Sequence, residues 1–165
     1  MGSKCSNKRL QTLRDNPDIR VTPYSGRGFG LSAVKVIGAG SLVVEYRGEI
    51  ISSDECVKRM TTVYKANRNH YFLDYGHGEV IDGHVKGTIA RYINHSCSPN
   101  CHIEKWQIDG EYQVGVFASR MIAEDEELTY DYNFESFGTR QVCRCGSSLC
   151  KGYIGTSKLD GRISY

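Results

Sequence analysis

The sequence contains little proline, a single tryptophan, no long apolar run and almost no excess of charge. No apolar stretch resembles a signal peptide or a membrane span, so we expect no membrane association. A formal net charge of +2 does not indicate a nucleic-acid-binding protein, and any basic patch must be local. With 3 prolines, no internal repeat and no low-complexity linker, the 165 residues are expected to form one domain around one core.

What the sequence does contain favours a mainly β domain. The 18 glycines and 11 tyrosines favour turns and strands over long helices. The dipeptide Asp109-Gly110 suits a tight hairpin turn, and Gly76-His77-Gly78 indicates a second hairpin. Short apolar or β-branched runs predict strands at residues 19–21, 42–46, 71–73, 80–82, 101–108 and 112–118.

One helix is predicted, from residue 52 or 53 to about residue 65. Ser52 and Glu55 have the spacing of a capping box, in which each side chain satisfies a free backbone N–H at the helix start. Apolar residues at intervals of three and four predict the buried face, formed by Val57, Met60 and Tyr64.

The densest polar stretch is residues 91–101, which read Arg-Tyr-Ile-Asn-His-Ser-Cys-Ser-Pro-Asn-Cys. An amide, an imidazole, hydroxyls and two thiols lie within eleven residues, more donors and acceptors than a structural loop needs. His95 taken alone is more often a satisfied buried histidine than a base or a ligand. The whole stretch nevertheless predicts a place where something is bound or transformed.

The cysteines indicate a metal site. Seven is an odd number, which leaves a thiol over in any complete disulfide scheme, and nothing in the sequence indicates secretion. Cys143, Cys145 and Cys150 supply three thiolates of a tetrahedral zinc site, and either Cys97 or Cys101 can supply the fourth. Zinc there would pin the C-terminal tail onto the central stretch. The alternative is that these are reduced core or surface cysteines.

Several motifs follow one another in a recognisable order. They are G-x-G at residues 28–30, E-Y-x-G-E at 45–49, H-Y at 70–71, R-Y-I-N-H-S-C at 91–97, E-L-T-Y-D-Y at 127–132 and the terminal C-x-C-x-x-x-x-C. Each is weak alone, since a lone G-x-G is usually a turn and alternating tyrosines are usually packing residues. In this order they resemble the SET-domain protein lysine methyltransferases, over roughly residues 19–155.

The resemblance implies a mainly β fold of small curved sheets with a C-terminal pseudoknot, one main helix and a zinc-binding post-SET tail. It implies S-adenosylmethionine as methyl donor, and structural zinc bound by Cys97, Cys143, Cys145 and Cys150. The catalytic tyrosine would be Tyr132, with Tyr130 at a position that limits the product to mono- or dimethyl-lysine. Cofactor contacts are implied for Arg27, Gly28, Phe29, His70, Tyr71, Phe72, Arg91, Asn94, His95 and Gln141.

The resemblance also implies a domain layout and a subclass. Residues 1–18 would be a tag and a remnant of a cysteine-rich AWS-type module, 19–138 the SET domain, 139–155 the post-SET zinc motif and 156–165 a basic tail. Cys5–Gln11 and Cys150–Gly155 look like the flanks of the histone H3 lysine 36 enzymes, closest to the Ash-one and nuclear-receptor-binding SET groups. Residues 133–142 would gate the lysine channel.

The expected partner is the histone H3 tail in the nucleosome, in the nucleus. We expect a monomer that can work with a chromatin adaptor protein, and a weak contact with nucleosomal DNA through Lys151, Lys158 and Arg162. Three alternatives remain open: a histone H3 lysine 4 methyltransferase of the mixed-lineage leukaemia type, a non-catalytic histone-binding SET module, and a zinc-stabilised scaffold.

Overall fold

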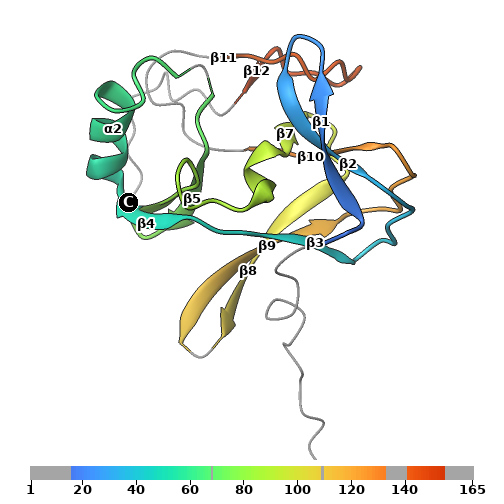
Figure 1. The fold of residues 1–165 in the computed structure, drawn as a ribbon, viewed down its shortest axis with the longest axis horizontal. Coiled ribbons are helices and arrows are strands. Elements are labelled where there is room, and N and C mark those ends of the chain that lie inside the picture. Colours follow the sequence, from blue (N-terminus) through green and yellow to red (C-terminus); the bar gives the residue numbers. More distant parts are fainter. Residues whose placement is uncertain (1–15, 68, 109, 133–140, 155–165) are drawn as a thin grey trace, which may run out of the picture.

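The computed structural model describes residues 16–67, 69–108, 110–132 and 141–154, and these form a mainly β fold of small sheets with one α-helix (Figure 1). The predictions for the Cys5–Gln11 segment, for most of the proposed gate and for Lys158 and Arg162 fall outside the described residues. No helix in the described ranges is long and apolar enough to cross a membrane.

The largest sheet joins segments that are far apart in the sequence. Its order is β1 (Ile19–Tyr24), β2 (Gly28–Ala33), β10 (Glu127–Tyr130) and β7 (Asn94–His95). Strand β10 is antiparallel to β2 and parallel to β7, so it lies between an N-terminal hairpin and the central polar stretch. This insertion of a C-terminal strand beside residues 94–95 is the arrangement on which the expected pseudoknot depends.

Three smaller sheets complete the fold. One has the order β3 (Leu42–Tyr46), β9 (Glu111–Ala118) and β8 (Cys101–Ile108), and its β8–β9 hairpin extends away from the body in Figure 1. Another has the order β4 (Glu49–Ser52), β6 (Glu79–Asp82) and β5 (Phe72–Gly76). The tail forms a two-stranded sheet of β11 (Gln141–Val142) and β12 (Tyr153–Ile154). A short 3-10 helix, η1 (Ile89–Tyr92), leads into β7.

Both predicted hairpins are confirmed. Strands β5 and β6 pair across a turn in which His77 and Gly78 adopt positive φ angles of 55° and 79°. Strands β8 and β9 pair along their full length, and Gly110 in their turn has a φ of 89°. Glycine adopts this conformation without steric cost, which is why the turn dipeptides located these hairpins correctly.

Helix α2 (Ser53–Thr61) begins as predicted but ends earlier, and one of its predicted core residues is exposed while Met60 packs inward as predicted. The Ser52 hydroxyl accepts a hydrogen bond from the Glu55 backbone N–H at 3.2 Å, as a capping residue should. The only helix residue that is fully buried is Cys56, which packs against β4 and β6, whereas Val57 is 43% exposed. The prediction that Val57 faces the core was therefore wrong by one position.

Tyr64 is buried as predicted, although it lies beyond the end of the helix. Its hydroxyl donates to the Asp82 carboxylate at 3.1 Å, and Arg59 donates to the same carboxylate at 2.8 Å. These contacts fasten the chain after Thr61 to the end of β6 without further helical turns. The helix therefore stops at Thr61 instead of near residue 65.

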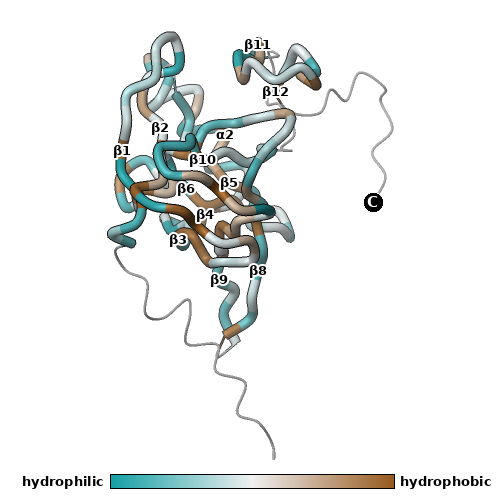
Figure 2. Tube along the Cα trace, turned by 90° about the vertical axis from the view of Figure 1, so that its right-hand side faces the viewer, coloured by the Kyte–Doolittle hydropathy of each residue, from teal (hydrophilic) through white to brown (hydrophobic). Residues whose placement is uncertain are grey.

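One apolar core connects the sheets. Its fully buried members come from β2, β3, η1, β9 and β10 and include Leu31, Val43, Ala90, Val116 and Leu128. In Figure 2 the brown, hydrophobic segments gather on the inner strands, whereas the exposed loops are mostly teal. Because β2, η1 and β10 all contribute to this core, the polar residues at their ends are held on rigid elements.

Candidate functional site

The pairing of β7 with β10 brings two of the sequence motifs together. Thr129 lies opposite Asn94, and Tyr130 lies opposite His95. The Ser96 backbone N–H donates to the Tyr130 carbonyl at 3.1 Å and continues the ladder. Residues about 35 positions apart thus become neighbours, and side chains from both motifs face one site.

Tyr132, the residue after this ladder, is held at both ends. Its hydroxyl donates to the Ile93 carbonyl at 2.9 Å, and its backbone N–H donates to His95 Nδ1 at 3.2 Å. Its ring lies 4.8 Å from the ring of Tyr130 and 5.4 Å from the imidazole of His95. The position of the hydroxyl is therefore set by the segment 93–95 as much as by its own strand.

Three tyrosines form one group, in which Tyr46 and Tyr130 are buried and Tyr132 is half-buried. Tyr46 and Tyr130 are 4% and 5% exposed, and the pKa values of both hydroxyls and of Tyr132 are raised, chiefly by burial and then by neighbouring tyrosines. All three hydroxyls are therefore neutral at physiological pH. Tyr46 was not among the predicted site residues, although it stands in the E-Y-x-G-E motif on a fully buried strand.

A second polar group links β2, β7 and β10. Arg27 pairs with one oxygen of the Glu127 carboxylate at 2.7 Å, and the Asn94 amide donates to the other oxygen at 2.9 Å. The same amide donates to the Phe29 carbonyl at 3.2 Å. Two predicted cofactor residues thus meet at Glu127, and Asn94 connects them to a third, Phe29. Glu127 was not among the predicted site residues, although it opens the E-L-T-Y-D-Y motif.

Gly30 allows this close approach. A Cβ atom added at Gly30 would lie 2.7 Å from the Asn94 amide nitrogen and 2.8 Å from the Tyr24 ring. Any side chain would push Asn94 away from Phe29. The G-x-G motif is therefore more than a turn, because its second glycine makes room for a predicted site residue.

Arg91 joins the aromatic side of the site. Its guanidinium donates to the Gly83 and His84 carbonyls at 3.2 and 3.0 Å and lies over the rings of Tyr71 and Tyr92 at 5.7 and 4.9 Å. Tyr92 in turn contacts the ring of Phe29 at 6.3 Å. Tyr92 was not predicted as a site residue, and its place next to Arg91 in the R-Y-I-N-H motif was the available signal.

Two features fit a bound polar ligand with an aromatic part. The Phe29 ring is 58% exposed beside Tyr92, so an aromatic surface is open to a ligand there. Arg91 Nε and His70 Nδ1 are buried and have no hydrogen-bond partner within the described ranges. These groups suit the methyl donor that the sequence resemblance implies.

Not every predicted cofactor residue joins this group. A Cβ atom added at Gly28 would lie 3.8 Å from the Asn69 amide nitrogen, so Gly28 is close to the segment that carries His70 and Tyr71. Phe72 packs on the helix side, against Tyr64 and His84. Gln141 is exposed in β11, where it pairs with Ile154. The cofactor roles of all ten residues stay predictions, and Phe72 and Gln141 lie apart from the Arg27–Glu127–Asn94 group.

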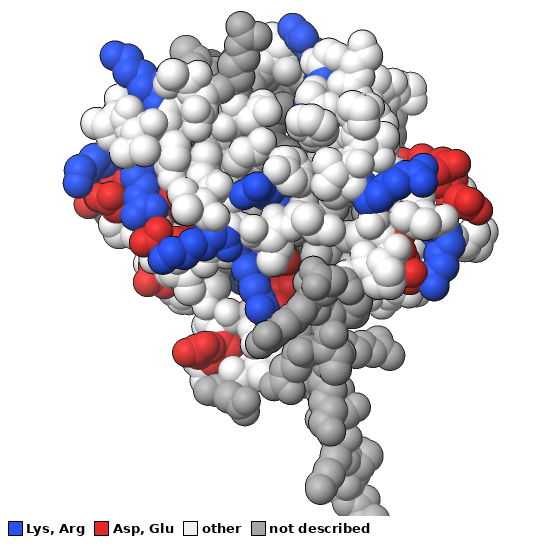
Figure 3. Space-filling model, viewed as in Figure 1, with Lys and Arg blue, Asp and Glu red and all other residues white. Residues whose placement is uncertain are grey.

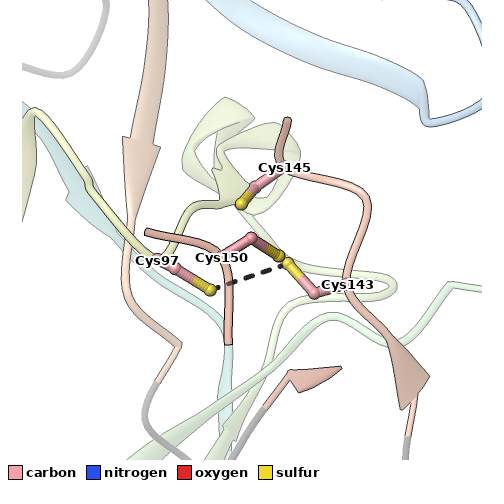
Figure 4. A group of neighbouring side chains, drawn as sticks. All are labelled: Cys97, Cys143, Cys145 and Cys150. Carbon is pink, nitrogen blue, oxygen red and sulfur yellow. Dashed lines mark hydrogen bonds between the residues drawn. The ribbon is translucent and has the colours of Figure 1, made fainter. Parts of the chain in front are cut away.

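Four cysteine sulfurs lie together, as Figure 4 shows. The Sγ atoms of Cys97, Cys143, Cys145 and Cys150 are all within 4.8 Å of one another, and the Cys97 and Cys143 sulfurs are 3.8 Å apart. Zinc–sulfur bonds of about 2.3 Å in a tetrahedron place neighbouring sulfurs about 3.8 Å apart. The geometry and the soft donor set therefore fit a structural zinc ion.

Cys101, the other candidate for the fourth position, lies elsewhere. It begins β8, is 1% exposed and directs its thiol to the Asn100 side-chain oxygen at 3.5 Å. Burial raises the pKa of its thiol to about 12, so it remains a protonated core residue. Of the two alternatives that the residues left open, the structure brings Cys97 to the cluster.

The tail that carries the three later cysteines is attached close to Tyr132. The Lys151 backbone N–H donates to Cys97 Sγ at 3.3 Å, and its ammonium group pairs with Asp131 at 3.2 Å. Arg144 reaches the Gly26 carbonyl at 3.5 Å, at the turn before β2. Lys151, predicted as a DNA contact, thus already has a partner in this chain.

The charge on the face seen in Figure 3 is mixed. Lys and Arg atoms lie beside Asp and Glu atoms around the rim, and the described part of this face has no broad region of one sign. Typical pairs are Arg20 with Asp125 and Arg120 with Glu126. This agrees with the small net charge.

Comparisons with known proteins agree with this arrangement. Histone-lysine N-methyltransferase ASHR3 of Arabidopsis thaliana is 40% identical over 157 residues, covering 94% of this chain and 31% of the relative. Histone-lysine N-methyltransferase ash1 of Drosophila melanogaster is 39% identical over 156 residues, covering 93% of this chain and 7% of the relative. A relative from Yarrowia lipolytica, "Histone-lysine N-methyltransferase, H3 lysine-36 specific", is 41% identical over 170 residues, covering 97% of this chain and 22% of the relative.

This chain spans less than a third of the length of each of these relatives. The SET domain family model matches residues 28–133, from the first glycine of the G-x-G motif to the residue after Tyr132. The matched segment contains β2, β7 and β10, which build the site, and the sequence resemblance is thereby confirmed. The chain belongs to the SET domain family.

Proposed function

We propose that this chain is the catalytic domain of a histone-lysine N-methyltransferase, which transfers a methyl group from S-adenosylmethionine to a lysine of histone H3. The observation that carries the proposal is the position of the Tyr132 hydroxyl, fixed on the Ile93 carbonyl within a buried group of neutral tyrosines. The relatives named above are histone-lysine N-methyltransferases, which supports the same reaction.

The residues around Tyr132 suit methyl transfer to an amine. S-adenosylmethionine would supply an electrophilic methyl group on a sulfonium sulfur, and the amine must reach it in line and without its extra proton. Burial among Tyr46, Tyr130 and Tyr132 disfavours a charged ammonium, so it lowers the pKa of an entering lysine. A neutral hydroxyl and the Ile93 carbonyl provide fixed polar groups that orient the reacting atoms.

A separate set of residues would hold the methyl donor. The group formed by Arg27, Asn94 and Glu127 and the exposed ring of Phe29 border one side, and Arg91 and His70 bring unpaired nitrogens from the other. Tyr71 lies between Arg91 and His84. Each of these residues belongs to a strand, to η1 or to a segment packed on them, so the pocket would be largely preformed.

Zinc would act structurally. It would supply the positive charge that lets four thiolates lie together and would fix the tail beside Asp131 and Tyr132. We assign residues 19–138 to the SET domain and 139–155 to the post-SET unit on this basis.

The preferred substrate is lysine 36 of histone H3. The Yarrowia relative is named as specific for this lysine and matches nearly all of this chain. The substrate would be the histone H3 tail in the nucleosome, which places the enzyme on chromatin in the nucleus. The competing assignment to lysine 4 of histone H3 rests on motifs that the two classes share.

The product is expected to be mono- or dimethyl-lysine. Tyr130 is buried, and its ring lies 4.8 Å from that of Tyr132. Its hydroxyl would hold a water molecule in the room that a further methyl group would need. Tyr130→Phe should shift the product towards higher methylation, measured by mass spectrometry of histone H3. An unchanged distribution would contradict the assignment.

Methyl transfer to recombinant nucleosomes tests the reaction. Tyr132→Phe keeps the ring and removes the hydroxyl, and it should lower kcat by roughly 100-fold or more, the scale for losing a positioned polar group. Tyr112→Phe is the matched control, because Tyr112 is 45% exposed in β9 and should tolerate the same change. Transfer by neither the parent chain nor the control, with cofactor bound, would favour a non-catalytic module.

A further inference from the structure

The imidazole of His95 uses both of its nitrogens within the protein. The Tyr132 backbone N–H donates to Nδ1 at 3.2 Å. A backbone N–H can only donate, so Nδ1 must be the acceptor, and the neutral ring carries its proton on Nε2. Nε2 lies 3.4 Å from Cys97 Sγ, within the range of a hydrogen bond to sulfur. The ring therefore donates to the sulfur of a cysteine in the metal cluster.

The surroundings leave this ring little freedom. The His95 side chain is 3% exposed, and its ring packs edge-to-face on Tyr132. One Asp131 oxygen lies 3.5 Å from Nδ1, longer than the contact with Tyr132, while the other Asp131 oxygen pairs with Lys151. The imidazole has no nitrogen left for a cofactor.

We infer that the imidazole of His95 is a positioning group that couples the cysteine cluster to Tyr132, rather than a side chain that binds the cofactor. A metal-bound thiolate is a better acceptor than a thiol, so the bond from Nε2 would be stronger and the ring orientation more firmly fixed when the cysteines hold zinc. A fixed ring then keeps Nδ1 within hydrogen-bond distance of the Tyr132 backbone N–H. The Tyr132 hydroxyl stays on the Ile93 carbonyl as a result. The inference rests on the proposed function only for the consequence that this placement has for catalysis.

The coupling depends on one ring that bears both contacts. A side chain that makes only one of the two contacts should therefore affect only that end, because it no longer transmits a change from one site to the other. Lys151 provides a second connection, because its backbone binds Cys97 and its ammonium binds Asp131. The cluster and the residue before Tyr132 are thus joined twice across a short distance.

Two substitutions separate the two ends of the ring. His95→Asn places an amide near the position of Nδ1, where its oxygen can still accept from Tyr132, but it does not reach Cys97. His95→Gln reaches the position of Nε2, where its amide can still donate to Cys97, but it leaves the Tyr132 N–H without its acceptor. His102→Asn in the exposed part of β8 is the matched control.

Zinc affinity is measured by competition with a chromogenic chelator, and Tyr132 by hydrogen exchange of its backbone amide in the zinc-loaded chain. His95→Asn should weaken zinc binding by about tenfold or more, the usual effect of losing a hydrogen bond to a metal ligand, with little change in Tyr132 exchange. His95→Gln should keep the zinc affinity and speed Tyr132 exchange. The control should change neither.

Equal effects of both substitutions on both readouts would indicate a merely structural histidine and would overturn the inference, as would unchanged zinc affinity in His95→Asn. If neither variant folds, nitrogen-15 NMR of the parent chain decides. A proton on Nε2 supports the inference, and a proton on Nδ1 refutes it. None of these measurements uses methyl transfer, so the inference and the proposed activity can fail separately.

Discussion

Asn100 offers a quantitative test of how the central stretch is joined to β10. It is 2% exposed, and its amide donates to the Glu127 carbonyl at 2.8 Å and to the Glu126 carboxylate at 2.9 Å, while its oxygen accepts from the Thr129 backbone N–H at 2.9 Å. Asn100→Ala removes these three hydrogen bonds together with two longer contacts to the Asn100 oxygen. Glu126 keeps Arg120 as a partner, so two backbone groups of β10 bear the loss.

A buried backbone group that loses its partner costs about 1–3 kcal/mol, so the free energy of unfolding should fall by about 2–6 kcal/mol. Urea unfolding of the zinc-loaded chain, followed by circular dichroism, measures this change. Asn67→Ala is the matched control, because Asn67 is exposed, and a surface change of this kind stays within about 0.5 kcal/mol. A loss below about 1 kcal/mol in Asn100→Ala would show that β10 is held mainly by its ladder and core packing.

Three further outcomes follow from single contacts. Gly30→Ala should weaken S-adenosylmethionine binding, measured by calorimetry, and lower the free energy of unfolding by about 1–3 kcal/mol, measured by thermal unfolding, because its Cβ would displace Asn94. Gly38→Ala is the control, because its Cβ would meet only an ordinary contact, and it should change neither quantity. Cys145→Ser should abolish stoichiometric zinc binding, measured by atomic emission, whereas Cys101→Ala should retain the zinc. Loss of zinc from Cys101→Ala would refute the proposed set of four cysteine ligands. Hydrogen bonds from Arg120 lower the pKa of Glu126 from 4.5 to about 2, so the stability that Glu126 contributes is present above pH 4.5 and is lost as the pH falls towards 2. Glu126→Gln should flatten the dependence of the free energy of unfolding on pH in that window. An unchanged slope would contradict the role of the Arg120–Glu126 pair.

Local features of the fold were predictable from the sequence. Turn dipeptides located both hairpins because positive φ angles select glycine, and the capping box located the start of α2. One residue of the buried helix face was not predictable, because Cys56 and Val57 are both acceptable core residues and only tertiary packing on β4 and β6 selects Cys56. The end of the helix likewise depends on Asp82, which is distant in the sequence.

The sequence predicted many of the residues in the site, but not the contacts that they make with one another. Spacing alone left Cys97 and Cys101 as equal donors, and the choice depends on Cys101 being the first residue of a buried strand. Glu127 was missed because its role arises from the parallel pairing of β7 with β10, a long-range register that has no local signal. Tyr46 was missed because a tyrosine on a buried strand is usually a packing residue.

The central claim is tested most directly by mass spectrometry of histone H3 after incubation of this chain, zinc and S-adenosylmethionine with recombinant nucleosomes. The account predicts mono- and dimethylation at lysine 36 by the parent chain and by Tyr112→Phe, and roughly 100-fold less by Tyr132→Phe. Replacing lysine 36 of the histone should remove the signal. Equal methylation by the parent chain and Tyr132→Phe, or an unaltered signal on the replaced histone, would contradict the account.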